Sequence, residues 1–152
     1  MKLVKLIFVL NLVHTILGCA NHAMSVDGIN NPLVQIKASV IKSLPLGLRK
    51  SSINGREFES KFYVVKGKKA VAAKSRPLRN MARITILGDR RPYTIEVKVF
   101  VQKRVGYSDI NGHVYKNLRY DKQQARHIAQ GIKKRLTNRR EDMNVIDDFR
   151  VF

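Results

Sequence analysis

The sequence has 152 residues, enough for one domain of ordinary size, and it is strongly basic. Thirty Lys and Arg residues against 11 Asp and Glu residues give a formal net charge of +19, with one cysteine and no tryptophan. A single cysteine excludes an intramolecular disulfide framework and a zinc site built from several cysteines, so the fold must depend on its hydrophobic core.

The first residues combine a basic start with an apolar run. Lys2 and Lys5 precede residues 6–17 (LIFVLNLVHTIL), and small residues follow. This order is typical of a bacterial secretory signal, whereas a membrane span needs about 20 apolar residues. We therefore expect export, with residues 1–18 as the signal peptide.

The only cysteine follows this signal directly. The motif Ile16-Leu17-Gly18-Cys19 resembles the lipobox of bacterial lipoproteins. The resemblance implies cleavage before Cys19, diacylglycerol on its thiol, and anchoring by fatty acyl chains such as palmitate. It also implies that Ala20, rather than Asp, favours the outer membrane, with the protein facing the periplasm. Cleavage after Ala20 remains open, because Gly18 and Ala20 are also small. The product would then be a free secreted basic protein.

The segment after the cysteine has the composition of a linker. Residues 20–32 (ANHAMSVDGINNP) are rich in Asn, Gly, Ser, Asp and Pro and lack periodicity. We predict that residues 19–32 are the lipidated cysteine and a flexible tether, and that residues 33–152 form a single basic domain.

From residue 33 to residue 120, apolar residues mostly alternate with polar ones, as in strands with one buried face. The pattern predicts strands at residues 34–40, 58–64, 82–87 and 93–101, a hairpin tip at 66–68 leading into 70–74, and a protruding hairpin at 105–117. Connections are predicted at residues 46–55, ending in an Asn-Gly turn, and at 88–92, with another Asn-Gly turn at 111–112. These elements together describe an antiparallel meander.

A helical period begins only after this region. Asp121 is a suitable N-cap, and the apolar residues that follow at helical spacing are Ala125, Ile128, Ala129, Ile132 and Leu136. Arg139 and Arg140 are expected in the last turn, and residues 145–152 in a final strand. The predicted fold is therefore α+β: an antiparallel sheet, one long C-terminal helix packed on one face, and a C-terminal strand.

The basic residues are the candidate binding groups. Loss of residues 1–18 removes Lys2 and Lys5 and no acid, so the formal charge falls from +19 to +17. Such self-repulsion costs stability, and nearby anions would relieve it. Arginine can grip phosphate or carboxylate bidentately. The candidate anion-binding residues are Lys68, Lys69, Arg90, Arg91, Lys122, Arg126, Lys133, Lys134, Arg139 and Arg140.

Nucleic acid is the alternative ligand. Tyr107, Tyr115 and Tyr120 lie among Arg104, Lys116 and Arg119, a mixture suited to base stacking and phosphate contact. No helix-turn-helix, zinc-finger or RNP-like pattern accompanies them. We therefore favour packing of these tyrosines at the rim of the sheet, and keep a role in DNA uptake or secretion as the second hypothesis.

Signals of catalysis are weak. The sequence has no G-x-S-x-G elbow and no phosphate-binding G-x-x-x-x-G-K-[ST] loop. His113 and His127 form no metal-binding set with cysteine, and the acidic pairs Glu141-Asp142 and Asp147-Asp148 are expected in salt bridges. The sequence therefore predicts a non-enzymatic envelope lipoprotein without a cofactor. Its basic domain would bind an anionic glycan, lipid or protein, or serve as an accessory subunit.

Overall fold

The computed structural model describes residues 23–147 apart from residues 68, 74 and 111, and for residues 139–147 it describes only the helix backbone. The predicted signal peptide and Cys19 lie outside the described residues. The elements in chain order are β1 (Met24–Ile29), α2 (Leu33–Ser43), β2 (Leu48–Ser51), β3 (Glu57–Ser60), β4 (Tyr63–Lys66), β5 (Lys69–Ala72), β6 (Leu78–Leu87), β7 (Tyr93–Ser108), β8 (Gly112–Tyr120) and α3 (Lys122–Asp147).

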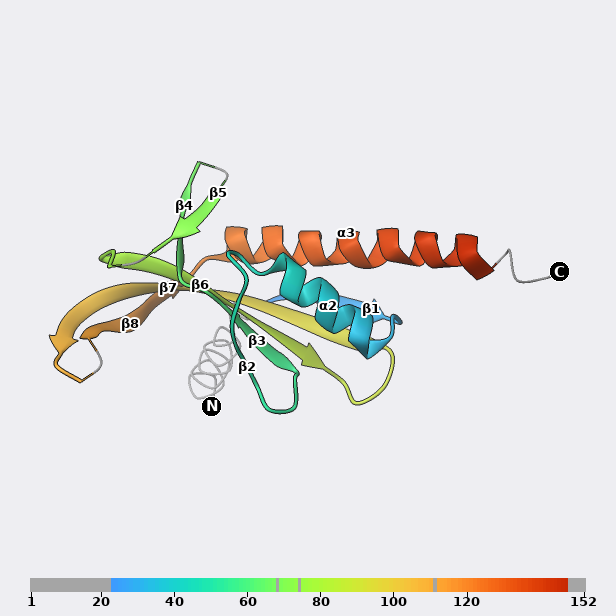
Figure 1. Cartoon of the computed structure of the whole chain (residues 1–152), viewed down its shortest axis with the longest axis horizontal. Helices are drawn as coiled ribbons and strands as arrows, with labels where there is room; N and C mark the ends of the chain where they lie inside the picture. Colours follow the sequence, from blue (N-terminus) through green and yellow to red (C-terminus); the bar gives the residue numbers. More distant parts are fainter. Residues whose placement is uncertain (1–22, 68, 74, 111, 148–152) are drawn as a thin grey trace, which may run out of the picture.

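The α+β class is confirmed. One antiparallel sheet has the strand order β1-β7-β6-β3-β2, with β4 paired to β5 and β6, and β8 paired to β7. The long helix α3 crosses one face of this sheet, and α2 lies beside it (Figure 1). The sheet therefore has one covered face and one face without a helix in the described part of the chain.

The predictions for β6, β7 and the start of α3 are confirmed. The alternate residues Tyr93, Ile95, Val97, Val99 and Val101 of β7 are all buried. The backbone N–H of Gln124 donates to the Asp121 carboxylate at 2.9 Å, which is an N-cap of α3. The predicted apolar stripe of α3, from Ala125 to Leu136, is buried as expected.

The strand predicted at residues 34–40 is wrong, because this segment belongs to helix α2. Ile36, Val40 and Leu44 are buried, while Val34 is 78% exposed. Apolar residues four apart satisfy both a period of two and one helical turn, so their spacing fits either structure. Packing of α2 against α3 and the sheet decides for the helix.

The tether predicted at residues 19–32 is also partly wrong. Residues 24–29 form β1, which pairs with β7 so that Val26 lies opposite Ile95. Met24 and Val26 pack against the core and Ile29 is buried. The edge of β7 supplies the hydrogen bonds that this polar segment cannot supply alone, so the folded unit begins before Pro32.

The connection predicted at residues 46–55 contains strand β2, and the strand predicted at 58–64 divides into β3 and β4. The chain turns between them, because buried Ser60 accepts a hydrogen bond from the Ala82 backbone N–H at 2.9 Å and donates to the Lys61 carbonyl at 2.8 Å. The hairpin tip at Gly67 is confirmed, since Lys66 pairs with Lys69 across it.

The final strand predicted at residues 145–152 is wrong for residues 145–147. Helix α3 runs to Asp147, so residues 145–147 are helical and Arg139 and Arg140 do not lie in its last turn. Neither glycine nor proline interrupts residues 132–147, which lets the helix continue. Residues 148–152 lie outside the described part of the chain.

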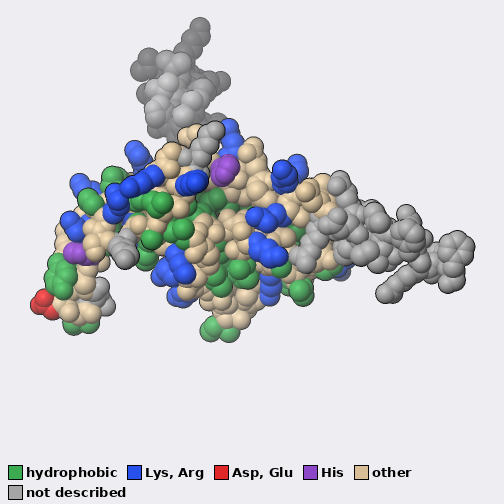
Figure 2. All heavy atoms as spheres, turned by 45° about the horizontal axis from the view of Figure 1, so that its top comes forward, with side chains coloured by type: hydrophobic (Ala, Val, Ile, Leu, Met, Phe, Trp, Pro, Cys, Tyr) green, Lys and Arg blue, Asp and Glu red, His purple; other side chains and the backbone are tan. Residues whose placement is uncertain are grey.

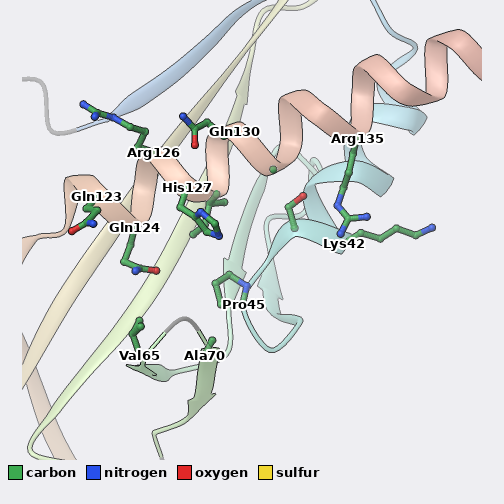
Figure 3. Close-up of a pocket in the computed structure, with 14 residues that line it drawn as sticks. Lys42, Pro45, Val65, Ala70, Gln123, Gln124, Arg126, His127, Gln130 and Arg135 are labelled. Atoms are coloured by element: carbon green, nitrogen blue, oxygen red, sulfur yellow. The ribbon is translucent and has the colours of Figure 1, made fainter.

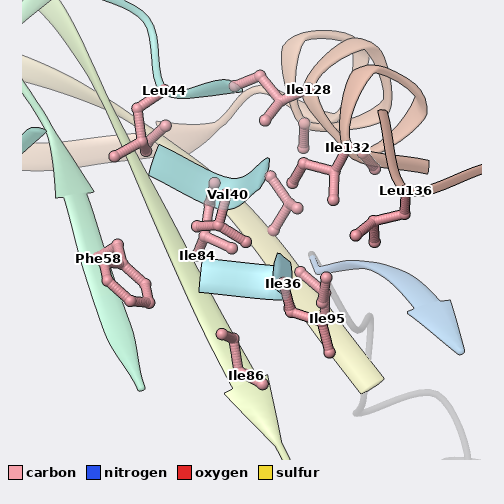
Figure 4. Packing of buried hydrophobic residues seen from close by; sticks show 14 of the residues in the cluster. Ile36, Val40, Leu44, Phe58, Ile84, Ile86, Ile95, Ile128, Ile132 and Leu136 are labelled. Carbon is pink, nitrogen blue, oxygen red and sulfur yellow. The ribbon is translucent and has the colours of Figure 1, made fainter. Parts of the chain in front are cut away.

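The core fills the space between the helices and the covered face of the sheet. Figure 4 shows side chains of α2, α3 and the strands meeting there, among them Ile36, Val40, Ile84, Ile95, Ile132 and Leu136. Because this stripe of α3 faces the sheet, the polar residues of the helix are turned outward and toward its neighbours.

Candidate anion-binding cleft

A cleft of about 740 Å³ lies between the two helices and the β4–β5 hairpin. In Figure 3, Gln124 and His127 point from α3 toward Val65 and Ala70 of the hairpin, and Arg135 points toward Lys42 at the end of α2. Arg126 and Gln130 also border the cleft. Three separate segments of the chain thus form its walls.

The helical repeat explains how α3 presents this wall. His127, Gly131 and Arg135 are four residues apart and therefore lie one above another on the helix. Apart from its chain neighbours and the backbone of its own helix, Gly131 has no described atom within 4 Å of the place where a side chain would begin. A helix-interior glycine costs stability relative to alanine, and here its missing side chain leaves the cleft open between His127 and Arg135.

The cleft carries cations without carboxylates. Lys42, Arg126 and Arg135 line it, and the described part of its lining contains no Asp or Glu. The sequences of α2, the β4–β5 hairpin and residues 122–140 of α3 contain none either. Figure 2 shows Lys and Arg side chains spread over one face of the molecule, with acidic atoms visible only at the outer end of the β7–β8 hairpin.

The ion pairs among the described residues lie elsewhere, on the sheet. Glu59 binds both Arg49 and Arg83, the latter at 2.8 Å, and Glu57 lies 3.3 Å from Arg83. The remaining pair, Lys98 with Glu96, is at 3.4 Å. Among the described residues, the acidic side chains of the sheet therefore pair with Arg49, Arg83 and Lys98, and none of them pairs with a cation of the cleft.

An arginine lies between two aromatic rings on the open face of the sheet, which is the face without a helix in the described part of the chain. The Arg79 guanidinium carbon lies 3.4 Å from the ring centres of both Phe62 and Tyr115. Burial lowers the pKa of Arg79, and the nearby Arg49 lowers it further, while Tyr115 opposes the change. The Tyr115 hydroxyl donates to the Arg76 carbonyl at 2.9 Å. The stack therefore joins Tyr115 of β8 to Arg79 of β6 and to Phe62, which precedes β4.

The structure gathers only part of the predicted anion-binding set at the cleft. Arg126 borders it, whereas Lys69, Lys122, Lys133 and Lys134 are exposed outside its lining. Arg90 and Arg91 lie in the turn between β6 and β7, at the opposite end of β6 from its pairing with β4. Lys68 and the side chains of Arg139 and Arg140 lie outside the description.

Sequence reasoning missed Lys42, Arg135 and the glutamines of the cleft. Arg135 could have been found from its spacing of eight residues from His127. Lys42 could not be found in this way, because the sequence predicts a strand at residues 34–40 and not the helix that carries Lys42. The cleft also depends on the distant β4–β5 hairpin, and no local pattern reports that proximity.

The remaining predicted residues have other environments. The Tyr120 ring packs 5.1 Å from that of Phe100, and Tyr107 contacts His113 edge-on at 5.5 Å. Of the residues described, no group of three or more His, Cys, Asp or Glu could hold a metal ion. The side chains of Glu141, Asp142 and Asp147, and all of Asp148, lie outside the description, so their expected salt bridges stay predictions.

No helix in the described part of the chain is both long and apolar enough to cross a membrane. Comparison with protein-family models, curated proteins and solved structures finds no match to this chain. The chemistry of the cleft and the N-terminal sequence are therefore the features that bear on function.

Proposed function

We propose that this chain is a non-enzymatic lipoprotein of the bacterial envelope whose basic cleft binds an anionic envelope component. The observation that carries the proposal is the cleft itself, lined by Lys42, Arg126 and Arg135 without a carboxylate. Uncompensated cations around a concave site attract anions and raise their local concentration.

The residue types of the cleft favour a phosphorylated or carboxylated glycan or lipid headgroup. Guanidinium and ammonium groups bind phosphate and carboxylate oxygens. Gln123, Gln124 and Gln130 line the same cleft, and their amides can donate to and accept from sugar hydroxyls. The described lining holds no Phe, Tyr or Trp, and His127 is its one aromatic ring, so base stacking has little support there.

The N-terminal sequence supports the location. A thioether to diacylglycerol accounts for a single cysteine at residue 19, and two or three acyl chains hold a protein on a membrane far more firmly than one. The intact mass of the protein extracted from its own membranes tests this step. We expect a chain beginning at Cys19 with diacylglycerol and an amide-linked acyl chain. A lipid-free chain beginning at Asn21 would contradict it.

Binding is tested by retention on immobilised lipopolysaccharide and on cell-wall fractions at 150 mM salt, with a single-stranded oligonucleotide as competitor. The proposal predicts retention on an envelope fraction and little competition. Retention on oligonucleotide alone at this salt would favour the nucleic-acid alternative, because purely electrostatic binding to DNA weakens steeply as salt increases.

A further inference from the structure

The outer half of the β7–β8 hairpin projects beyond the body of the molecule (Figure 1). Its end exposes large apolar side chains, with Tyr107 69% and Ile110 92% exposed, and Val105 about half exposed. Single exposed hydrophobic residues are ordinary on protein surfaces. Here they gather at one projecting end, where Figure 2 shows hydrophobic atoms together.

Cations lie directly behind this apolar end. Lys103 is opposite Lys116 in the β7–β8 register, and Arg119 is opposite Val101. Like charges placed directly across two strands are destabilising, and an anionic surface would relieve that cost. Tyr is typical of the headgroup level of membranes, and cations near an anionic leaflet are attracted to its phosphates. The order of apolar tip and basic stem therefore fits a bilayer surface.

Strand β1 begins at the end of the sheet from which the hairpin extends. β1 runs antiparallel to β7, with Met24 opposite Val97 and Ile29 opposite Tyr93, so the chain enters β1 from the hairpin side. Cys19 precedes Met24 by five residues, which span at most about 17 Å. β7 continues from Val97, opposite Met24, to Ser108, which is roughly 36 Å of strand. The end of the hairpin therefore lies on the same side of the sheet as the start of β1.

We infer that the outer end of the β7–β8 hairpin docks into the surface of the anionic bilayer that carries the lipid anchor. Tyr107 and Ile110 enter the headgroup region, and Lys103 and Lys116 contact lipid phosphates. This inference rests on the proposed lipidation of Cys19. Asp109, next to Ile110, is the one acidic residue in the outer half of the hairpin, and an anionic surface repels it.

The absence of tryptophan allows a direct experiment. Ile110→Trp places a unique fluorophore at the hairpin end, and Ile53→Trp places one at a fully exposed site in the β2–β3 turn as the matched control. Each full-length lipidated protein is reconstituted in phosphatidylglycerol–phosphatidylethanolamine vesicles, with and without brominated lipid. We expect a blue-shifted, quenched emission for I110W and a water-like, unquenched emission for I53W.

Water-like emission from I110W, or equal quenching of both variants, would overturn the inference. The intact mass reports the anchor and the tryptophan emission reports the hairpin, so the two proposals can fail separately.

A charge-matched comparison gives a second readout on a Cys19→Ser chain made without residues 1–18, which has no lipid anchor and no signal peptide. K103Q/K116Q should lower its partition into the same vesicles about tenfold, and D109N should raise it. R90Q/R91Q removes the same charge from the β6–β7 turn and should have an effect within twofold. Equal losses from the two double variants would contradict docking by the hairpin.

Discussion

The two faces of the sheet are stabilised in different ways. On the covered face, aliphatic side chains of α2 and α3 pack against the strands, with Ile36, Ile95 and Ile132 fully buried. On the open face, Glu59 is 8% exposed and binds Arg49 and Arg83. These two arginines also lie over the rings of Phe62 and Phe100, and Arg79 lies over Phe62 as well. One face is held by apolar burial and the other by charges that compensate each other.

This difference separates charged side chains that form ion pairs within the fold from charged side chains that can bind a ligand. On the open face, Glu59 neutralises Arg49 and Arg83, so these two arginines contribute to folding. The outer side of the helical layer has cations and no carboxylate in the cleft. Total charge does not distinguish the arginines bound to Glu59 from the cations of the cleft, whereas ion pairing does. The cleft is therefore the candidate binding site.

The largest predicted effect tests the apolar side of this comparison. Ile132→Ala should lower the free energy of unfolding by about 3–4 kcal/mol, because it leaves a cavity in a core that is fully buried at this position. Urea denaturation measures the loss. Val34→Ala, at an exposed position of α2, is the control and should change stability little. A loss below about 1 kcal/mol for I132A would contradict the packing of α3.

The next prediction tests the charged side. Glu59→Gln should cost about 2–3 kcal/mol, because Arg49 and Arg83 would both lose their shared carboxylate. Glu96→Gln removes a more exposed carboxylate paired with Lys98 and should cost less than about 1 kcal/mol. Urea denaturation of both variants at pH 7 compares them. Equal costs would show that Glu59 has no special structural role.

The buried hydroxyl of Tyr63 tests the same comparison, because it is a polar group on the covered face of the sheet. Its hydroxyl has no hydrogen-bond partner among the described residues. Tyr63→Phe should therefore leave stability unchanged or raise it by up to about 1 kcal/mol at pH 7. Chemical denaturation of wild type and variant measures this difference, and a loss above 1 kcal/mol would contradict it.

The same residue gives a pH dependence. Burial raises the pKa of Tyr63 well above its ordinary value, and the Asp121 carboxylate adds to the effect. Below about pH 10 the hydroxyl is neutral in both folded and unfolded chains, so its contribution is constant. Above pH 10 the unfolded chain releases the proton first, so wild type should lose stability faster than Y63F. Parallel curves from pH 9 to 11 would contradict burial of this hydroxyl.

The smallest effect concerns the helix wall of the cleft. Gly131→Ala should raise the free energy of unfolding by about 0.5–1 kcal/mol, because it restores helix propensity where there is open space. Gly131→Leu should instead fill the cleft and weaken retention on envelope fractions. Thermal unfolding and the retention assay measure the two effects. Undiminished retention of G131L would place the binding surface elsewhere.

The sequence predicts the long regular elements best. Strand β7 alternates over many residues, and α3 combines an N-cap at Asp121 with a sustained apolar stripe, so local pattern and tertiary packing agree. The sequence predicts a strand in place of α2 and a tether in place of β1, because the local pattern does not determine either element. The four-residue spacing from Ile36 to Leu44 fits two periods, and β1 needs the edge of β7 to form.

The cleft is less predictable than the fold. Its basic character follows from composition, and Arg126 was identified from α3 alone. Lys42 and the hairpin residue Val65 join it only through tertiary structure, and Arg90 and Arg91 are equally basic in sequence but lie in another turn. Charge can therefore be counted from the sequence, but its grouping requires the fold.

In the proposed function, the cations of the cleft, which have no carboxylate partner among the described residues, bind the envelope anion, and net charge alone does not. The most direct measurement compares the affinity of K42Q/R135Q and R90Q/R91Q for lipopolysaccharide by calorimetric titration at 150 mM salt. Both double variants lose two positive charges. The account predicts a loss of at least tenfold for K42Q/R135Q and less than twofold for R90Q/R91Q. Equal losses would show that binding depends on overall charge and would contradict the cleft as the binding site.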